Sequence, residues 1–222
     1  MKKQRLVFWL AMTMIVAPVA SYQMYYRTSP LYEVSLSDAE LKQVKRQQPD
    51  LVVDKSARRI YVVKQGDFAR YPDGSYISWP ISLGKDPMGT KMKMGDEKTP
   101  EGLYAFTDHA AASGYYGSLW LNYPSATDAT RGKSAGLLSD DQHKAVVKAE
   151  RKGIRPPDKT PMGGQILIHG TNKKIPKLEM SLPSDTIARH IETDGCVGMS
   201  NQGIADMRSH MDSTSGTVLI IP

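Results

Sequence analysis

From Leu51 onward, the apolar residues of this chain recur with a period of two, which is the pattern of half-buried β-strands. Turn signals such as Gln65-Gly66 and Pro72-Asp73-Gly74 separate the apolar runs. Strands are expected over Leu51–Val53, Arg59–Val63, Asp67–Tyr71, Tyr76–Leu83, Leu103–Thr107, Ser118–Asn122, Ile166–Ile168 and Thr217–Ile221. The predicted fold class is therefore mainly β with a few helices (α+β).

Helix signals interrupt this pattern at three places. Helices are expected over Asp38–Gln47, Asp140–Lys152 and Asn201–Met211. Each of the first two follows a serine, with a glutamate or glutamine three residues further on, as in a capping box. The second lies within a long connection, residues 123–164. Connections of this length inside a domain are often functional lids, and the alternative is a disordered surface insertion.

The first 26 residues have the layout of an export signal. Lys2, Lys3 and Arg5 precede an almost wholly apolar run over residues 6–20, and small residues follow. A buried N-terminal helix is the alternative, but the charges flank one side only and no amphipathic stripe is present. Cleavage and retention as a membrane anchor both stay open, because residues 6–26 carry no charge. Either outcome predicts that the rest of the chain lies outside the cytoplasm.

Charge and composition narrow the classes of partner. The formal net charge of +6 falls to +3 without Lys2, Lys3 and Arg5, which is compatible with an anionic polymer but also with an ordinary solvated surface. No cluster of basic and aromatic residues indicates nucleic-acid binding. One cysteine and scattered histidines give no zinc-ligand spacing, and no glycine-rich phosphate loop is present. We therefore expect no metal, no cofactor and no nucleic acid, and contact with a membrane only through the N-terminal segment.

Cys196 is the single cysteine of the chain, so an intramolecular disulfide is impossible. Most lone cysteines are buried and inert, but this one ends the run Thr193-Asp194-Gly195-Cys196. Gly195 permits a tight turn, and the N–H groups of Gly195 and Cys196 could converge on an oxyanion. The helix expected from Asn201 would lower the pKa of the thiol if its N-terminus lies close.

A thiol nucleophile needs a base within hydrogen-bond reach. His169 follows the apolar strand at residues 166–168 and precedes Gly170, so it is expected at the mouth of a strand, facing a pocket. The alternative for such a residue is a structural histidine at a strand edge. His190, six residues before Cys196, is a weaker rival base. Three further histidines lie in a loop or in polar helical stretches: His109, His143 and His210.

Several motifs occur in a fixed order along the chain. They are Ser82-Leu83-Gly84, the run GDEKTPEG at residues 95–102, Asn122-Tyr123-Pro124, Gly163-Gly164, Ile166-Leu167-Ile168-His169-Gly170 and Thr193-Asp194-Gly195-Cys196. Together they resemble the L,D-transpeptidases, the YkuD-type catalytic domain of bacterial wall enzymes. That family has a strand ending in His-Gly, then a motif ending in Gly-Cys, and upstream a G-D-x-x-T-P-E-G turn. The resemblance covers residues 51–222, the predicted catalytic domain, and leaves residues 27–50 as a spacer after the export segment.

The resemblance is closer to one subgroup than to the others. Many members have Ser-His-Gly-Cys with an arginine two residues after the cysteine, whereas this chain has Asp194 and Gly198 at those positions. A subgroup with Thr-Asp-Gly-Cys is more similar. The missing arginine removes a bidentate carboxylate partner, so substrate contacts are expected to differ. Asp194 could shape the turn by bonding to the backbone, or its charge could raise the pKa of the thiol.

The resemblance implies a YkuD-like β-sandwich catalytic domain in which residues 123–164 form a helical lid insertion. It implies a peptidoglycan L,D-transpeptidase that forms cross-links through a thioester of Cys196 on tetrapeptide stems, with His169 as the base. The group that orients His169 could be a backbone carbonyl or a side chain. Candidate substrate contacts are Gly170, Thr193, Asp194 and Tyr123.

The implied partners are peptidoglycan stem peptides, with a wall-attached protein as a further candidate acceptor. The chain is then expected to be periplasmic, or anchored to the inner membrane and facing the periplasm. Two alternatives stay open. The same site could use water, as an L,D-carboxypeptidase or as a hydrolase that releases a protein from the wall. A non-catalytic peptidoglycan-binding module, from another class, would form no thioester.

Overall fold

The structure, a computed structural model, describes residues 34, 36–171 and 193–222 of the chain. The predicted export segment and His190 lie outside the described residues. Residues 36–69 and 77–222 belong to one compact unit, which holds all the helices and strands named below. Residues 70–76 belong to a second unit, where the Tyr71 N–H donates to the Ser75 carbonyl at 2.8 Å and closes the predicted turn.

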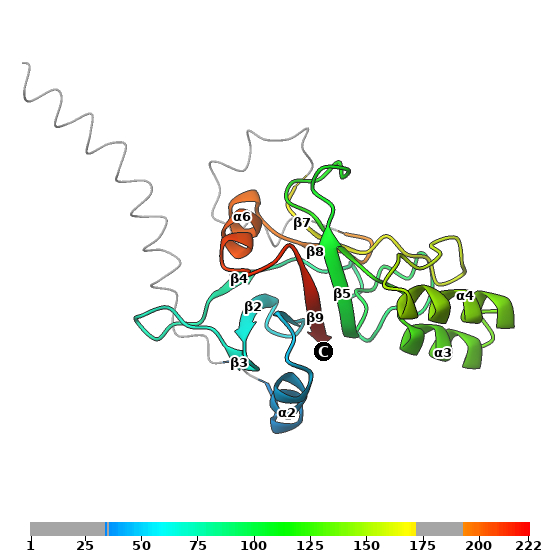
Figure 1. Cartoon of the computed structure of the whole chain (residues 1–222), viewed down its shortest axis with the longest axis horizontal. Helices are drawn as coiled ribbons and strands as arrows, with labels where there is room; N and C mark the ends of the chain where they lie inside the picture. The colour runs from blue at the N-terminus through cyan, green and yellow to red at the C-terminus, as the bar shows by residue number, and fades with distance from the viewer. Residues whose placement is uncertain (1–33, 35, 172–192) are drawn as a thin grey trace, which may run out of the picture. The chain divides into compact units, whose positions relative to one another are not determined.

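One curled sheet forms the centre of the larger unit (Figure 1). The strands run in the order β3-β2-β1-β9-β5-β6-β7-β8, and β4 pairs with β2. Their bounds are Leu51–Asp54 (β1), Arg59–Lys64 (β2), Asp67–Phe68 (β3), Ser78–Pro80 (β4), Gly102–Asp108 (β5), Leu119–Leu121 (β6), Leu167–His169 (β7), Val197–Gly198 (β8) and Ser215–Ile221 (β9). The β1–β9 and β7–β8 pairs are parallel. The predicted class, mainly β with a few helices, is confirmed.

The centre of the sheet explains why the C-terminal run of the sequence is so apolar. Strand β9 lies between β1 and β5, pairing Leu219 with Val52 on one side and with Leu103 on the other. The side chains of β1 and the last four of β9 are buried. Fully burying one large aliphatic side chain contributes about 1.5–3 kcal/mol. The last strand of the chain is therefore part of the core.

All eight predicted strands are present, although β3 and β4 are shorter than expected. Strand β8 was not predicted, because two residues are too few to show a period. Four helices lie in the described residues: α2 (Asp38–Gln47), α3 (Ala126–Ser134), α4 (Asp140–Arg151) and α6 (Asn201–Ser209). None of the helices in the described residues is long and apolar enough to cross a membrane.

Helix α3 was missed, although Ser125 and Asp128 form a capping box before it. Its interior glycine, Gly132, disfavours a helix on propensity alone. Packing favours the glycine, because a Cβ there would lie 2.5 Å from the sulfur of the buried Met162 side chain, which would have to move. Tertiary contact therefore overrides local propensity at this position.

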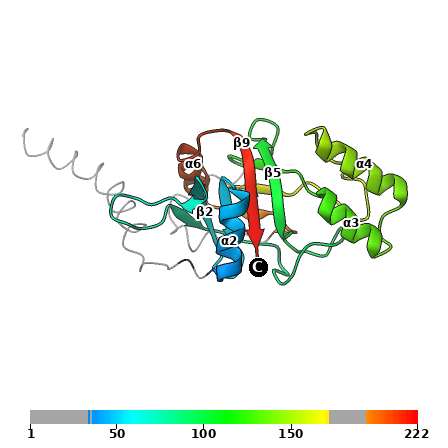
Figure 2. The same ribbon diagram turned by 60° about the horizontal axis from the view of Figure 1, so that its bottom comes forward.

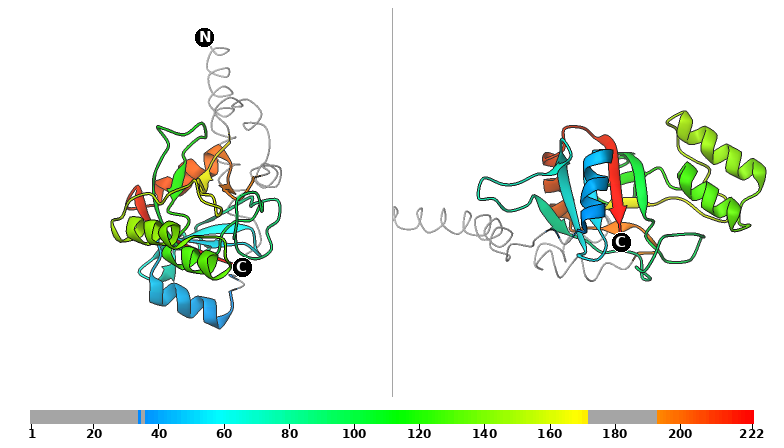
Figure 3. Two further views of the ribbon diagram at one scale, coloured as in Figure 1. Left: turned by 90° about the vertical axis from the view of Figure 1, so that its right-hand side faces the viewer. Right: turned by 90° about the horizontal axis from the view of Figure 1, so that it is seen from below.

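The insertion at residues 123–164 is folded and has a small core of its own. Helices α3 and α4 lie side by side (Figures 2 and 3). The buried cluster between them consists of Ala129, Leu138, Val146 and Met162. This packing explains why a segment without strands holds a defined conformation. Its role as a lid stays a prediction.

Met162→Ala should destabilise the insertion selectively. The side chain is fully buried against Gly132 and the core of α3 and α4. Its removal leaves a cavity that costs about 2–5 kcal/mol. Hydrogen exchange read by mass spectrometry should become faster in α3 and α4, while β9 keeps its protection. The matched control is Met88→Ala, at a side chain that is 76% exposed, and it should change neither region. An equal loss of protection in both regions would contradict a separate core.

Candidate active site

His169 and Cys196 lie on neighbouring strands of the sheet. Strand β7 ends at His169, and β8 begins directly after Cys196. Their parallel register pairs Ile168 with Val197 and His169 with Gly198. Extended by one residue, this register puts Cys196 beside Leu167. Because side chains alternate along a strand, His169 and Cys196 project from the same side of the sheet.

The two sides of the sheet differ at this point. Ile168 and Val197 point to one side and are fully buried in the core. The other side carries Leu167, His169 and Cys196. It also carries Trp120 of β6, which pairs with Leu167 of β7. We call the side that carries Trp120, Leu167, His169 and Cys196 the active face.

His169 is held as a neutral imidazole. Its Nδ1 atom lies 2.6 Å from the Gly170 carbonyl oxygen. A carbonyl can only accept, so Nδ1 carries a proton, and in the neutral ring Nε2 then keeps its lone pair. Burial lowers the pKa of His169, although the bond to Gly170 acts in the opposite direction. The orienting group left open by the sequence is therefore a backbone carbonyl, and the ring is ready to accept a proton at Nε2.

An aromatic side chain covers the imidazole. The ring of Tyr115 lies 4.0 Å from that of His169, centroid to centroid, with the two planes tilted by 36°. The Gly170 N–H donates to the Tyr116 carbonyl at 2.8 Å, which ties the loop that follows β5 to the end of β7. Tyr115 was not predicted as a site residue, since a Tyr-Tyr pair in a loop has no pattern that links it to a distant histidine.

Cys196 is half-buried and rests as a thiol. Its Sγ lies 3.7 Å from the Gln165 carbonyl oxygen, to which it donates, and no bond joins it to His169 in the described part of the chain. Burial raises the pKa of the thiol, and the charge of Asp194 adds to this effect. The Leu167 N–H and the charge of Lys91 act in the opposite direction and lower the pKa. The sequence led us to expect that the helix at Asn201 would lower the pKa of the thiol. The pKa is raised instead, because burial outweighs the groups that favour the thiolate.

The turn before Cys196 is shaped by Thr193. Its hydroxyl donates to the Cys196 carbonyl at 2.7 Å and accepts from the Gly195 N–H at 3.3 Å. Asp194 does not bond to the turn's backbone in the described residues. It is exposed, and it pairs with Lys85 at 3.0 Å. Of the two expectations for Asp194, only the effect of its charge on the pKa of the thiol is found.

Gly195 is needed for both its conformation and its small size. Its φ is +136°, a region that other residues rarely adopt. A Cβ on Gly195 would lie 2.6 Å from the Lys98 carbonyl oxygen. The cysteine turn therefore packs directly on the loop that ends at Lys98.

That loop is organised by a buried ion pair that the sequence did not reveal. Lys91 Nζ lies 2.7 Å from the Asp96 carboxylate, and both side chains are buried. Asp96 also accepts from the N–H groups of Met92 and Lys93. Burial acts to raise the pKa of Asp96, but Lys91 and these N–H groups outweigh it and lower the pKa. Lys91 lies in a polar run, so nothing in the local pattern marked it as buried.

The other two predicted contacts lie in the framework of the site. Gly170 packs closely on helix α6, since a Cβ there would lie 2.3 Å from the Asn201 amide oxygen. Tyr123 is buried, and its hydroxyl donates to the Lys91 carbonyl at 3.4 Å. Burial raises the pKa of Tyr123 well above its ordinary range. The structure thus joins Tyr123 to the loop at residues 91–98.

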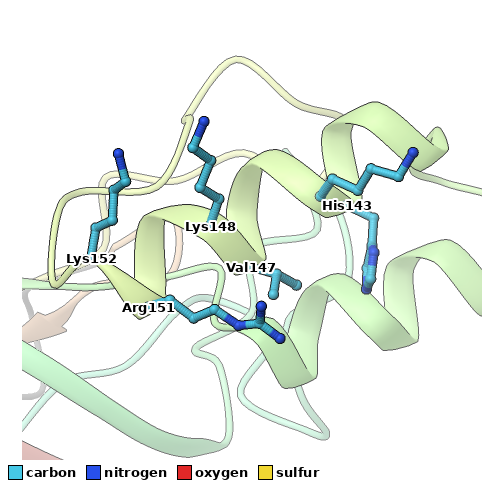
Figure 4. Close-up of a pocket in the computed structure, with 6 residues that line it drawn as sticks. His143, Val147, Lys148, Arg151 and Lys152 are labelled. Carbon is cyan, nitrogen blue, oxygen red and sulfur yellow. The ribbon is translucent and has the colours of Figure 1, made fainter.

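The remaining described histidines have other neighbours. His109 contacts the Trp120 ring edge-on at 4.9 Å, His143 lies 3.4 Å from the Thr130 hydroxyl, and His210 Nδ1 lies 2.9 Å from the Asp206 carbonyl. A recess on α4 is lined by His143, Lys144, Val147, Lys148, Arg151 and Lys152 (Figure 4). Neither Cys196 nor His169 lines it. Within the described ranges, no group of three or more His, Cys, Asp or Glu side chains could hold a metal ion.

The L,D-transpeptidase catalytic domain family, YkuD, matches residues 48–221, and the chain therefore belongs to this family. No curated protein sequence matches significantly.

Three solved structures are similar. The helical cell shape determining protein Pgp2 from Campylobacter jejuni is 21% identical, with 82% of this chain and 54% of that chain covered and a TM-score of 0.44. Bd1075 from Bdellovibrio bacteriovorus is 22% identical, with 78% and 47% covered and a TM-score of 0.41. An L,D-transpeptidase from Xylanimonas cellulosilytica is 13% identical, with 77% and 59% covered and a TM-score of 0.36. This chain corresponds to about half the length of each.

Gly195→Ala should destabilise the fold and displace the thiol. The positive φ and the approach to the Lys98 carbonyl both oppose a Cβ, and strain of this kind costs about 1–3 kcal/mol. Thermal unfolding should show a lower Tm than that of Cys196→Ala, a variant that leaves the backbone unchanged. Gly74→Ala is the matched control for positive φ without crowding, because nothing lies within 4 Å of its Cβ position. A smaller loss for Gly195→Ala than for Gly74→Ala would contradict the packing argument.

Alkylation of Cys196 by iodoacetamide in the free protein should rise with pH, with a midpoint above 9.0, because burial raises the pKa of the thiol from that value. His169→Ala should change this midpoint little, since no bond joins the ring to Sγ in the described structure. The acid limb of kcat/KM, in contrast, should lie below pH 6.5, because the lowered pKa of His169 keeps it neutral in weak acid. An alkylation midpoint near neutral pH would instead indicate a preformed thiolate–imidazolium pair.

Proposed function

We propose that this chain is a peptidoglycan L,D-transpeptidase of the Thr-Asp-Gly-Cys subgroup, which forms cross-links through a thioester on Cys196. The carrying observation is the juxtaposition of Cys196 with His169 across the parallel β7–β8 pair, where the imidazole is neutral and has its Nε2 lone pair available. Membership of the L,D-transpeptidase family makes peptidoglycan peptides the substrate class.

The proposed reaction begins with proton transfer from Cys196 Sγ to His169 Nε2. The thiol leaves its bond to Gln165 as the substrate enters, and the thiolate attacks the carbonyl on the L-side of an L,D-peptide bond in a tetrapeptide stem. Backbone N–H groups at the Gly195-Cys196 turn stabilise the oxyanion. His169 then returns the proton to the departing amine of the terminal D-alanine, leaving a thioester on Cys196.

The second half of the reaction resolves the thioester. An amine, such as the side-chain amine of a diaminopimelate residue, attacks the thioester carbonyl and gives its proton to His169. The new amide is the cross-link, and the proton on His169 returns to the sulfur. The Cys196 thiol and the His169 imidazole are both neutral at rest. The thiolate and the imidazolium therefore exist only during the reaction.

We assign the insertion at residues 123–164 as the lid that favours amine over water as acceptor. Its last part is tied to the active face by a bond from the Gln165 amide to Asp158 at 2.8 Å. The Gln165 carbonyl, in turn, holds the resting thiol. A lid that is linked to the nucleophile through Gln165 can exclude water when the acceptor binds.

The wall setting is also proposed. The N-terminal segment is assigned as a signal peptide or an inner-membrane anchor, so that the catalytic domain faces the periplasm. Stem peptides are the proposed donors. A wall-attached protein is a second candidate acceptor, because any amine that reaches the thioester can resolve it.

Cys196→Ala should abolish product formation, and His169→Ala should reduce kcat by about 10²–10⁴-fold, the usual contribution of a general base. The measurement is incubation of the purified protein with disaccharide-tetrapeptide, followed by mass spectrometry of the products. Cross-linked dimer is the expected product. His143→Ala is the matched control, since this histidine lies on α4. Near-normal turnover by His169→Ala would move the base to another residue, with His190 the first to test.

The product distribution decides between the remaining functions. Tripeptide as the sole product would replace the transpeptidase by an L,D-carboxypeptidase or a wall-protein-releasing hydrolase with the same site. Carbapenem labelling tests the thioester step itself, with an adduct expected on Cys196 and none in Cys196→Ala. Folded protein that forms no adduct and no product would indicate a non-catalytic peptidoglycan-binding module.

A further inference from the structure

An arginine from the insertion lies over the active face. The Arg155 guanidinium carbon lies 3.2 Å from the centroid of the Trp120 ring. Trp120 is almost fully buried, whereas Arg155 is exposed. In the described part of the chain, the guanidinium has no hydrogen bond or ion pair with any residue. A guanidinium stacked on an indole keeps its N–H groups at the edge of the stack, where they can bind an oxyanion in bidentate geometry.

The sheet register relates this guanidinium to the nucleophile. Trp120 pairs with Leu167, and Leu167 lies beside Cys196 in the parallel β7–β8 register. The three residues thus form one row across the active face. Neighbouring strands are about 4.7–4.9 Å apart, so the backbone at Trp120 is roughly 10 Å from that at Cys196. Arg155 therefore lies on the same side of the sheet as the thiol, over a strand that is two strand spacings from Cys196.

The position of Trp120 is well defined, so the guanidinium that stacks on it has a rigid support. The ring is held edge-on by His109 at 4.9 Å, and its strand is paired on both sides, with β5 and with β7. Rigid support under a charged group reduces the ordering cost when a ligand binds.

We propose that Arg155 forms a subsite for a carboxylate of the peptide stem other than that of the terminal D-alanine. The carboxylate of the leaving D-alanine is only one residue from the reacting carbonyl, about 3.3–3.6 Å along an extended chain, which is shorter than two strand spacings. We therefore assign the subsite to another carboxylate of the stem. This subsite rests on the proposed function for its substrate class, peptides with free carboxylates.

The absence of a side chain at Gly198 adds to the importance of the proposed Arg155 subsite. It occupies the position two residues after the cysteine, and it has no side chain to bind an anion. Its backbone exchanges two hydrogen bonds with Ser82, at 2.8 and 3.0 Å. Arg155 brings a guanidinium to the active face from a different segment, so the insertion acts in substrate recognition as well as in covering the site.

The test measures binding apart from catalysis. Disaccharide-tetrapeptide is titrated into the full chain carrying Cys196→Ala, with and without Arg155→Gln, by calorimetry. The expected result is a Kd raised roughly 10- to 100-fold by Arg155→Gln, as for loss of a charge-assisted hydrogen-bonded pair. Arg155→Lys should recover only part of the affinity, because an ammonium cannot make the bidentate contact. Arg151→Gln, at an exposed arginine on the end of α4, is the matched control and should leave Kd unchanged.

Amidated ligands locate the carboxylate. With the terminal D-alanine amidated, Arg155→Gln should still weaken binding by the same factor. With the other stem carboxylates amidated, binding to the unaltered Arg155 should be weak, and Arg155→Gln should have no further effect. If only amidation of the D-alanine removes the effect of Arg155→Gln, the assigned position of the subsite is wrong.

Two outcomes would overturn the subsite altogether. One is an unchanged Kd in Arg155→Gln with a lowered Tm, which would make Arg155 a cover for Trp120 alone. The other is an equal loss of affinity in Arg151→Gln, which would make the effect one of general charge. A failure of the proposed function looks different, because protein with its native Cys196 would form neither adduct nor product while the Arg155-dependent binding persisted.

Discussion

The site depends on the pairing of a two-residue strand. Strand β8 has only Val197 and Gly198, yet it is held on both sides, by β7 through Ile168 and His169 and by the backbone of Ser82. This pairing sets the register between Cys196 and His169, and therefore the side of the sheet on which both project. A slip of one residue would turn Cys196 into the core, because side chains alternate along a strand. The Thr193 hydroxyl and the tight contact of Gly195 with Lys98 keep the turn before β8 in place.

The electrostatics of the site follow from burial more than from charge. Burial lowers the pKa of His169 and raises that of Cys196, so both groups rest in their neutral forms. Lys91 is the cation that opposes this for the thiol, but it is itself paired with Asp96. A free thiol is protected by this arrangement, because the thiolate is the form that oxidants attack. In the proposed mechanism, the thiolate forms only when substrate enters.

The insertion at residues 123–164 connects the proposed Arg155 subsite to the reacting groups. Its helices pack on one another through their own apolar cluster, so the segment can hold a shape outside the sheet. Its last residues return to the active face, where Arg155 stacks on Trp120 and Asp158 bonds to Gln165. The same Gln165 accepts from the Cys196 thiol. One short segment therefore links Arg155, the proposed carboxylate subsite, to the residue that accepts from the resting thiol.

Much of the fold and part of the candidate site could be predicted from the sequence. The period of two located the strands, capping serines located α2 and α4, and the order of motifs singled out Cys196 and His169, since each of these signals lies within a few neighbouring residues. Strand β8 and helix α3 were missed because their conformations depend on long-range packing, against β7 and against Met162. The same reason applies to Lys91, Tyr115 and Arg155. Their residue types carry no local signal, and only the strand order, which brings β6, β7 and β8 side by side, decides what lies beside the thiol and the imidazole.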